Sequence, residues 1–447
     1  MDHRGGGTGR GPGARGRARA VGACHDLAEG ERVRVLIGAD TWAPDVNGAS
    51  YAGQRLAAEL AARGHEVHVV APSRGLRSRP PCRVGPVVEH RVRSCRVPKP
   101  PGFRLCPPPG LRQTCRAILR RVRPDVVHVQ SHMVLGRMLL TAAADLGVPS
   151  MATTHMIPEN IIPAISFLHL PESGLKKLFW WDAVRVLSRA GLVTAPTPLA
   201  ASMAEQGGVP GPVLPVSNGL DLGRFRPDTT GRGPAFRARH GIPGGAPLVG
   251  FVGRLDREKH VDELVRATAL LRAGAVPDAQ LVVVGDGEER ARLGALVRAQ
   301  HLEHAVTFTG RLTDDEIPDV YPALDVFCNA GTAELQSLVT LEAMATGKPV
   351  VAVDAGALPH LARPGENGWR YPHGDVAALA DRLARVLGDP DGAAALGAAS
   401  LRIASEHSLA ATVDTFEELY RTKARPVVPV RAFRSGRRAR RPADTRR

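Results

Sequence analysis

The chain has 447 residues and a formal net charge of +15. This length exceeds what one hydrophobic core usually supports, so two domains are expected. No run of about eighteen apolar residues occurs, which excludes a membrane-spanning helix. The Gly/Arg-rich start lacks the apolar segment of a secretory signal, so we expect a cytoplasmic protein.

The six cysteines show no Cys-x-x-Cys spacing, so reduced thiols are expected rather than a zinc site or disulfides. Most of the excess charge lies in residues 1–31 and 422–447, which we predict to be disordered basic extensions. Such arms could bind nucleic acid. Arginine greatly outnumbers lysine beside abundant Ala, Gly and Pro, so composition is the favoured explanation and nucleic-acid binding is not expected.

The first half alternates strands and helices, which predicts an α/β domain with a parallel sheet over residues 32–217. A strand over 33–38, a helix over 49–63 and a strand over 65–71 form the first βαβ unit. The later predicted elements are strands over 124–130, 148–154, 192–197 and 213–217, and helices over 134–146 and 166–189.

The loop after the first strand contains Asn47 and Gly48. Open α/β sheets bind ligands at the carboxyl ends of their strands. A glycine there lets backbone N–H groups approach a phosphate. Asn-Gly is also common in ordinary turns, so both interpretations stay open.

Residues 73–123 are Pro-rich and irregular, and many arginines there face a single acid, Glu89. This flank could rest on anionic lipid, at about 1 kcal/mol per basic side chain. It could equally hold an acidic soluble acceptor or form a solvated surface. Only 111–123 has helical spacing.

The second half restarts the alternation with a strand over 248–252, and we predict a second domain over 218–402. Residues 229–247, rich in Gly and Pro, are predicted as the connection. The remaining predicted elements are a helix ending near 271, strands over 280–285, 305–310, 325–329 and 349–353, and helices over 376–387 and 409–421.

Arg254 and Lys259 lie in the loop after the strand over 248–252. Two cations and the amides at a helix start can hold a diphosphate and stabilise negative charge on a departing nucleotide. No Asp-x-Asp cluster is placed there to bind Mg²⁺. The alternative is a surface salt-bridge cluster with Asp256 and Glu258.

Glu334 and Glu342 lie on a loop entering a helix that ends at Gly347. Leu338 and Leu341 fall at helical spacing, so we expect one face in the core and the two carboxylates presented. Their helical separation of about 12 Å suits one ligand held at two places, since carboxylates sharing one glycosidic bond lie about 5–10 Å apart. A solvated face favoured by the helix dipole is the alternative.

The stretch from Glu334 to Ala352 resembles the signature of retaining nucleotide-sugar glycosyltransferases of family 4, of the GT-B type. In this stretch seven residues separate Glu334 from Glu342, and Glu342 is followed by Ala-Met-Ala-Thr-Gly-Lys-Pro-Val-Val-Ala. The segments around Gly48, His155 and Lys259 are similar to this family as well. The family usually has an aromatic residue and a glycine after its first glutamate, where this chain has Leu335-Gln336-Ser337. The resemblance extends over about 33–421.

The resemblance implies two Rossmann-like domains facing across a cleft, with a helix over 403–421 crossing back to the first domain. It implies metal-independent transfer of a hexose, mannose or glucose, from a GDP- or UDP-linked donor to a lipid or small-molecule acceptor, without a covalent enzyme nucleophile. The enzyme could lie on the inner face of the cell membrane. Two alternatives stay open, a sugar-nucleotide epimerase or hydrolase on the same fold and a non-catalytic basic adapter for membrane or nucleic acid.

The resemblance also assigns site residues. Arg254 and Lys259 would stabilise the leaving diphosphate, Glu334 would orient the sugar and His155 would lie near the reacting carbon. On the donor side, Glu342 would contact the ribose and Leu312 would lie beside the base. Gly48 and the amides of Ser337, Leu338 and Val339 would also contact the donor. On the acceptor side, the implied residues are Asn47, Glu159 and Asn160.

Overall fold

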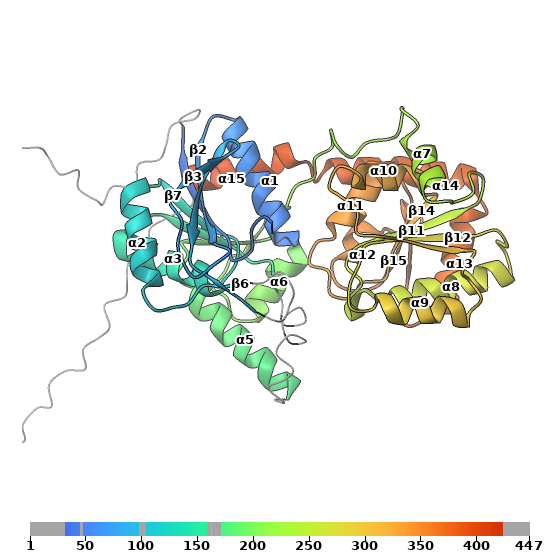
Figure 1. Cartoon of the computed structure of the whole chain (residues 1–447), viewed down its shortest axis with the longest axis horizontal. Helices are drawn as coiled ribbons and strands as arrows, with labels where there is room; N and C mark the ends of the chain where they lie inside the picture. The colour runs from blue at the N-terminus through green and yellow to red at the C-terminus, as the bar shows by residue number, and fades with distance from the viewer. Residues whose placement is uncertain are drawn as a thin grey trace, which may run out of the picture.

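The computed structural model describes residues 32–44, 48–97, 104–156, 158, 162 and 171–422. The predicted acceptor-side residues Asn47, Glu159 and Asn160 lie outside the described residues. Two lobes stand side by side, and each is an α/β layer structure around its own sheet (Figure 1). The predicted α/β class with two parallel sheets is confirmed.

The first sheet has the strand order β10-β9-β8-β7-β1-β2-β4-β3, and its pairs are parallel except for β3 with β4. Its strands are β1 (Arg34–Gly38), β2 (Glu66–Pro72), β3 (Cys82–Val84), β4 (Val87–Val92), β7 (Val126–Val129), β8 (Ser150–Thr153), β9 (Leu192–Ala195) and β10 (Leu214–Pro215). A separate ribbon pairs β5 (Cys95–Arg96) with β6 (Arg104–Leu105). The helices of this lobe are α1 (Gly48–Ala62), α2 (Leu111–Val122), α3 (Val134–Leu146), α5 (Glu172–Leu187) and α6 (Pro198–Gln206).

The second sheet is parallel throughout and has the order β13-β12-β11-β14-β15-β16. Its strands are β11 (Leu248–Val252), β12 (Gln280–Val284), β13 (Val306–Gly310), β14 (Val326–Asn329), β15 (Val350–Val353) and β16 (Gly368–Tyr371). The helical elements are α7 (Arg232–Arg239), η2 (Arg257–Lys259), α8 (Val261–Ala273), α9 (Arg290–Ala299), α10 (Ile317–Val320), η3 (Tyr321–Ala323), α11 (Leu338–Ala345), α12 (Leu358–Leu361), α13 (Val376–Leu387) and α14 (Pro390–Ser405).

The last helix, α15 (Leu409–Thr422), follows the second lobe in sequence but packs against α1 of the first lobe (Figure 1). Val413, Phe416 and Tyr420 are buried with β1 in one hydrophobic core. The hydroxyl of Tyr420 also bonds Nδ1 of His128 at 2.8 Å. The helix therefore anchors the second lobe to the first through a buried apolar face.

Several regions differ from the sequence prediction. Residues 229–247 are not a plain connection, because α7 forms within them and buries Phe236 and Arg237. The Arg237 guanidinium pairs with Asp325 at 2.9 Å and bonds the Ala323 carbonyl at 2.8 Å, so tertiary contacts override the poor local helix signal. Residues 166–170 of the predicted helix over 166–189 lie outside the described residues, and α5 ends at Leu187. The helices α6, α9, α10, α12 and α14 were not predicted.

The strand β4 was missed inside the arginine-rich flank because charged residues mask its alternation. Glu89 is buried there, where it accepts the indole N–H of Trp42 at 2.9 Å and pairs with Arg91 at 2.7 Å. A buried charge with such partners is tolerated in a sheet, although hydrophobic periodicity cannot reveal it. Within the described residues, no helix combines the length and apolarity needed to span a bilayer.

Candidate active site

The carboxyl ends of β11 and β12 come together so closely that side chains are excluded between them. A Cβ on Gly285 would lie 1.8 Å from the Gly253 carbonyl oxygen, and the Gly253 N–H bonds the Val284 carbonyl at 3.0 Å. This approach fixes the start of the loop that runs through η2 into α8. Lys259, the last residue of η2, is thereby held at the carboxyl edge of the sheet.

Lys259 and Glu334 meet at this edge. Lys259 Nζ lies 2.8 Å from Glu334 Oε1, and the two side chains are 17% and 14% exposed. Burial lowers the pKa of Lys259, but the Glu334 carboxylate outweighs burial and the pKa is raised above its usual value. The ammonium group therefore stays charged at neutral pH. The structure thus brings together the cationic loop and the acidic loop singled out in the sequence.

The backbone of Glu334 is supported from the next strand along the sheet. Its carbonyl accepts the Ala357 N–H at 2.8 Å. Gly356, with φ 57°, packs so closely that a Cβ would lie 2.7 Å from the same oxygen. The carboxylate of Glu334 is consequently placed by a rigid loop rather than by a solvated one.

Arg254 lies beside this pair but is held by acids of its own loop. Its guanidinium bonds Asp256 at 2.7 Å and lies 3.6 Å from Glu258, and the side chain is 58% exposed. The salt-bridge cluster weighed in the sequence analysis is therefore present in the structure. The exposure leaves the side chain able to exchange these partners for a diphosphate.

Glu342 contradicts the expectation of two presented carboxylates, because it is only 6% exposed. Its Oε2 accepts the hydroxyl hydrogen of Tyr321 at 2.6 Å, and its Oε1 pairs with Arg55 of the first lobe at 3.3 Å. Burial raises the pKa of Glu342, although Arg55 and the Tyr321 hydroxyl pull it back down. Helical spacing could not predict this, since Tyr321 comes from η3 and Arg55 from the first lobe, both outside α11.

The loop amides expected at a phosphate stand at the start of α11. The Ser337 hydroxyl turns inward, where it accepts from Asn329 Nδ2 and from the Thr340 hydroxyl, each at 2.9 Å. Its side chain is therefore bonded within the second lobe and does not point toward Lys259 and Glu334. The first N–H groups of a helix have no intrahelical acceptor, so the amides of Leu338 and Val339 can still serve an anion.

Leu335 and Gln336, which depart from the family pattern, join the two lobes. Leu335 is buried in the hydrophobic core of the first lobe, and its carbonyl accepts the Thr197 hydroxyl hydrogen at 2.9 Å. Gln336 accepts the Asn218 N–H and donates to the Ser217 hydroxyl, both at 2.8 Å. The two residues hold the Glu334 loop against the carboxyl edge of the first sheet.

His155 follows β8 on that edge, one strand away from the Thr197 contact. Its Nε2 lies 3.0 Å from Gln130 Oε1, and burial lowers the pKa of His155 to about 4. A carbonyl-type oxygen can only accept, so the neutral ring carries its proton on Nε2 and presents Nδ1 as an acceptor. Gln130 is bonded in turn to His128 at 3.2 Å, which fixes the amide.

The remaining predicted site residues are less constrained. Gly48 begins α1 and is exposed, and a Cβ there would meet no atom within 4 Å, so open space rather than crowding surrounds it. Leu312 packs partly against the core of the second lobe in the loop after β13. Two residues after it, Asp314 accepts the Tyr51 hydroxyl hydrogen at 3.0 Å, which adds another contact between the lobes.

Sequence reasoning missed Arg55, Tyr321 and Gln130. Arg55 and Tyr321 carry no local signal, because each becomes relevant only through the packing around Glu342. Gln130 could have been found, since a polar side chain directly after a buried strand lies at the ligand-binding edge of a parallel sheet.

Two doubly wound lobes that meet at the carboxyl edges of their sheets, with charged loops on one side and a histidine on the other, define a GT-B glycosyltransferase. Residues 46–224 match the model of "Glycosyltransferase Family 4" and residues 234–402 match that of "Glycosyl transferases group 1". The chain belongs to this glycosyltransferase family and is an enzyme of that class.

Known proteins agree with this classification. The chain is 35% identical to a "GDP-mannose-dependent alpha-mannosyltransferase" of Mycobacterium tuberculosis over 365 residues, which are 79% of this chain and 88% of that protein. It is 36% identical to the enzyme of the same description from Mycolicibacterium smegmatis, over 75% of this chain and 84% of that protein. The structure of a sucrose-phosphate synthase from Thermosynechococcus elongatus has the same fold, with a TM-score of 0.73, 22% identity, and coverage of 87% and 98% of the two chains.

Proposed function

We propose that the enzyme transfers a mannosyl group from GDP-mannose, with retention of configuration and without a metal ion, to a hydroxyl group of a lipid or small-molecule acceptor. The observation that carries the proposal is the Lys259–Glu334 ion pair at the edge where the two lobes meet. The donor sugar is suggested by the mycobacterial relatives, which are described as GDP-mannose-dependent. Glucose and UDP-linked donors are the alternatives.

In this proposal the second lobe holds the donor. Lys259 faces the diphosphate, and Arg254 leaves Asp256 to join it, so that two cations neutralise charge on the departing nucleotide. Glu334 orients the sugar hydroxyls, and the amides at the start of α11 bind a phosphate oxygen. Glu342 reaches the ribose once the ribose hydroxyls replace Arg55 as its partners. Lys259 and Arg254 would together supply the neutralisation that Mg²⁺ provides elsewhere.

The first lobe binds the acceptor. His155 is neutral at physiological pH, so it does not protonate the leaving group, and its Nδ1 is placed to accept a hydrogen bond from a substrate hydroxyl. The acceptor oxygen attacks the anomeric carbon on the face from which the diphosphate departs. As the new C–O bond forms, the bond to the diphosphate oxygen breaks and that oxygen takes the acceptor proton. No enzyme nucleophile takes part.

The test is nucleotide release from a panel of GDP- and UDP-linked mannose and glucose donors, measured with EDTA present. GDP-mannose turnover that depends on an acceptor is expected, with an α-linked product visible by NMR. Turnover without acceptor would indicate the epimerase or hydrolase alternative. Absence of both turnover and nucleoside-diphosphate binding would end the proposal. Trimming residues 1–20 and 423–447 tests the adapter alternative, which requires salt-dependent binding through those ends.

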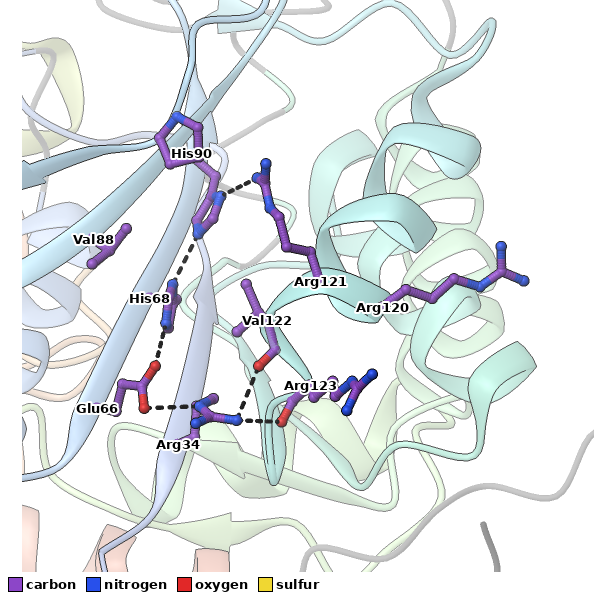
Figure 2. A pocket seen from close by; sticks show the side chains of 10 residues that line it. Arg34, Glu66, His68, Val88, His90, Arg120, Arg121, Val122 and Arg123 are labelled. Atoms are coloured by element: carbon purple, nitrogen blue, oxygen red, sulfur yellow. Dashed lines mark hydrogen bonds and ion pairs between the residues drawn. The ribbon is translucent and has the colours of Figure 1, made fainter. Parts of the chain in front are cut away.

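A peripheral contact with an anionic membrane is part of this proposal, and one cavity supports it. The cavity of about 550 Å³ is lined by Arg34, Arg120, Arg121 and Arg123, with Glu66 as its acid (Figure 2). Glu66, His68 and His90 form a hydrogen-bonded row across its floor, at 3.0 and 2.9 Å, and Arg121 bonds His90 at 3.2 Å. Burial lowers the pKa of His90 to about 4, so the cavity keeps a cationic rim beside a neutral His90.

This cavity lies at the amino ends of β1 and β2 and therefore away from the carboxyl edge that holds the site. In this proposal it would hold an anionic lipid headgroup, away from the Lys259–Glu334 site. Sedimentation with phosphatidylglycerol vesicles should fall in an Arg120→Ala/Arg121→Ala variant. The matched control is Arg266→Ala/Arg298→Ala on the second lobe. Equal sedimentation of both variants, or equal binding to phosphatidylcholine, would refute the contact.

A further inference from the structure

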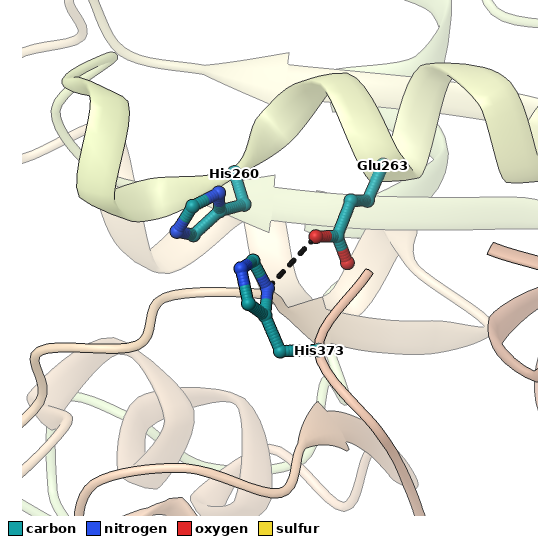
Figure 3. A group of neighbouring side chains, drawn as sticks. All are labelled: His260, Glu263 and His373. Carbon is teal, nitrogen blue, oxygen red and sulfur yellow. Dashed lines mark ion pairs between the residues drawn. The ribbon is translucent and has the colours of Figure 1, made fainter. Parts of the chain in front are cut away.

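Three side chains of metal-ligating type converge outside the proposed donor and acceptor contacts. His260 stands directly before α8, Glu263 lies in the first turn of that helix, and His373 follows β16 (Figure 3). One ligand atom from each residue can be chosen so that all three lie within 4.8 Å of one another. The cluster joins segments more than a hundred residues apart.

The carboxylate of Glu263 is buried, at 4% exposure, and is held on both oxygens. The hydroxyl of Tyr371 donates to Oε2 at 2.8 Å, and the N–H of Gly374 donates to Oε1 at 3.2 Å. Oε1 also lies 2.9 Å from His373 Nδ1, as the dashed line in Figure 3 marks. A carboxylate oriented by outer hydrogen bonds in this way matches the supporting shell of protein metal sites.

His260 occupies a backbone conformation that is unfavourable for its side chain. Its φ is 45°, in the left-handed region, where a residue other than glycine pays roughly 1 kcal/mol. In that conformation the imidazole lies over the ring of His373, with centroids 4.2 Å apart and planes at 57°. Its Nε2 makes only a long contact, 3.3 Å, to the Thr332 hydroxyl. A glycine would relieve the strain but would remove the ring.

Two imidazoles and one carboxylate are ligands that suit Zn²⁺, whereas Mg²⁺ and Ca²⁺ favour oxygen alone. With bonds of about 2.0–2.1 Å, neighbouring ligand atoms of a tetrahedral zinc ion lie about 3.3 Å apart. The cluster must therefore close by up to about 1.5 Å. His373 is 49% exposed, so its side chain can make that movement, and the same exposure gives an ion its entry path and room for a water ligand.

We propose that His260, Glu263 and His373 bind a divalent transition-metal ion of the zinc class. The ion would tie the loop before α8 to the loop after β16. Lys259 directly precedes His260, and the N–H of Thr332 bonds the Glu258 carbonyl at 3.1 Å, so the ion would stiffen the loops that present Lys259 and Glu334. It acts on these loops and not on the reacting atoms, and the inference does not depend on the identity of the donor or acceptor.

The experiment uses the full chain without a histidine tag, stripped with a chelator and then titrated with ZnCl₂ or MgCl₂. Zn²⁺ is expected to raise the Tm in a saturable manner, because a ligand that binds only the folded state stabilises it. Mg²⁺ is expected to leave the Tm unchanged. Co²⁺ should give the visible absorption of a four-coordinate ion. An unchanged Tm with Zn²⁺, or an equal response to Mg²⁺, would overturn the proposal.

Variants assign the response to the cluster. His260→Gly and His373→Ala should each lower the Zn²⁺ affinity at least about a hundredfold, and Tyr371→Phe, which removes an outer hydrogen bond, about ten- to a hundredfold. His301 is the matched control, since it has φ 54° and is exposed. His301→Gly relieves the same backbone strain and should keep the full zinc response. A full response in His260→Gly and His373→Ala would show that the ion binds elsewhere and would refute the assignment.

Should His373→Ala fail to fold, His260→Gly still decides the matter, because glycine accepts the φ of position 260 without strain. The apo form of His260→Gly is expected to unfold at the same temperature as the wild type or a higher one. Only the increment due to Zn²⁺ should disappear.

Discussion

The two sheet edges that face each other are built in opposite ways. The edge of the second lobe presents charges in pairs, Lys259 with Glu334 and Arg254 with Asp256, on loops fixed by close backbone packing. The edge of the first lobe presents a neutral histidine at the end of a buried row that runs from His155 through Gln130 and His128 to Tyr420. In the proposed function, the edge of the second lobe would bind the diphosphate and the edge of the first lobe would bind hydroxyl groups.

The difference shows how a two-lobed transferase divides its work. A diphosphate carries most of the charge of the reaction, so the lobe that holds it needs permanent cations. The lobe that holds a neutral acceptor needs hydrogen-bonding groups whose protonation does not vary with pH. Burial provides that constancy for His155, since it lowers the pKa to about 4.

The largest effect is expected when the cationic edge is broken. Lys259→Ala should reduce kcat by about a hundred- to a thousandfold, because removing one preorganised electrostatic partner of the developing charge typically costs that much. The measurement is steady-state GDP release from GDP-mannose with acceptor. The matched control is Arg257→Ala, two residues before Lys259 in η2. The Arg257 side chain is 86% exposed and lies 3.6 Å from Glu289. Similar losses in both variants would contradict a specific role for Lys259.

The buried, neutral histidines of the first lobe should make the folded protein less stable at acidic pH. Burial lowers the pKa values of His128, His132 and His155 to about 3, 4 and 4, against 6.5 in the unfolded chain. Below pH 6.5 these histidines therefore bind protons in the unfolded state but not in the folded state. The free energy of unfolding accordingly falls as the pH drops from about 6.5 to about 4. Each fully shifted histidine contributes up to about 3 kcal/mol of this loss.

Hydrogen exchange at pH 5 and pH 7.5 locates this effect, and the first lobe is expected to lose protection before the second. His132→Leu removes one titrating ring that packs edge-on against Phe179 at 5.1 Å. In the steep part of the pH range, this variant should flatten the dependence of unfolding free energy on pH by about 1.4 kcal/mol per pH unit, which is one proton. An unchanged slope would mean that His132 is already protonated in the folded protein.

The same contrast explains what the sequence could reveal. The edge of the second lobe was predicted from local spacing, since Lys259 and Glu334 belong to motifs within single strand-to-helix loops. The parallel sheets were predicted because their strands are short apolar runs between helices. The burial of Glu342 was not predictable, because Arg55 and Tyr321 reach it from far along the chain. The row behind His155 depends on α15 in the same way.

A smaller effect is expected from substituting Gln336, in the loop that joins the two sheet edges. Gln336 is 8% exposed and bonds both Asn218 and Ser217 of the segment between the lobes. Gln336→Ala leaves a backbone N–H without its acceptor, which costs about 1–3 kcal/mol. We expect about a tenfold fall in kcat/KM for the donor, with the fold retained. Gln206→Ala is the control, because that exposed amide donates to the Ser202 hydroxyl within α6 at 3.0 Å and bonds neither Ser217 nor Asn218. If both variants behave as wild type, Gln336 does not hold the lobes together.

The smallest effect is expected at the rim, where Tyr51 of α1 donates to Asp314 at 3.0 Å on an exposed surface. Because this hydrogen bond is exposed to solvent, we expect it at the low end of the usual range, about 0.5 kcal/mol, so Tyr51→Phe should change the donor KM by about two- to threefold and leave kcat unaltered. A larger loss in kcat would mean that the Tyr51 hydroxyl enters the site when the lobes close around substrate. The charged edge and the neutral edge would then share a residue, and the division of labour between the two lobes would have to be redrawn at α1.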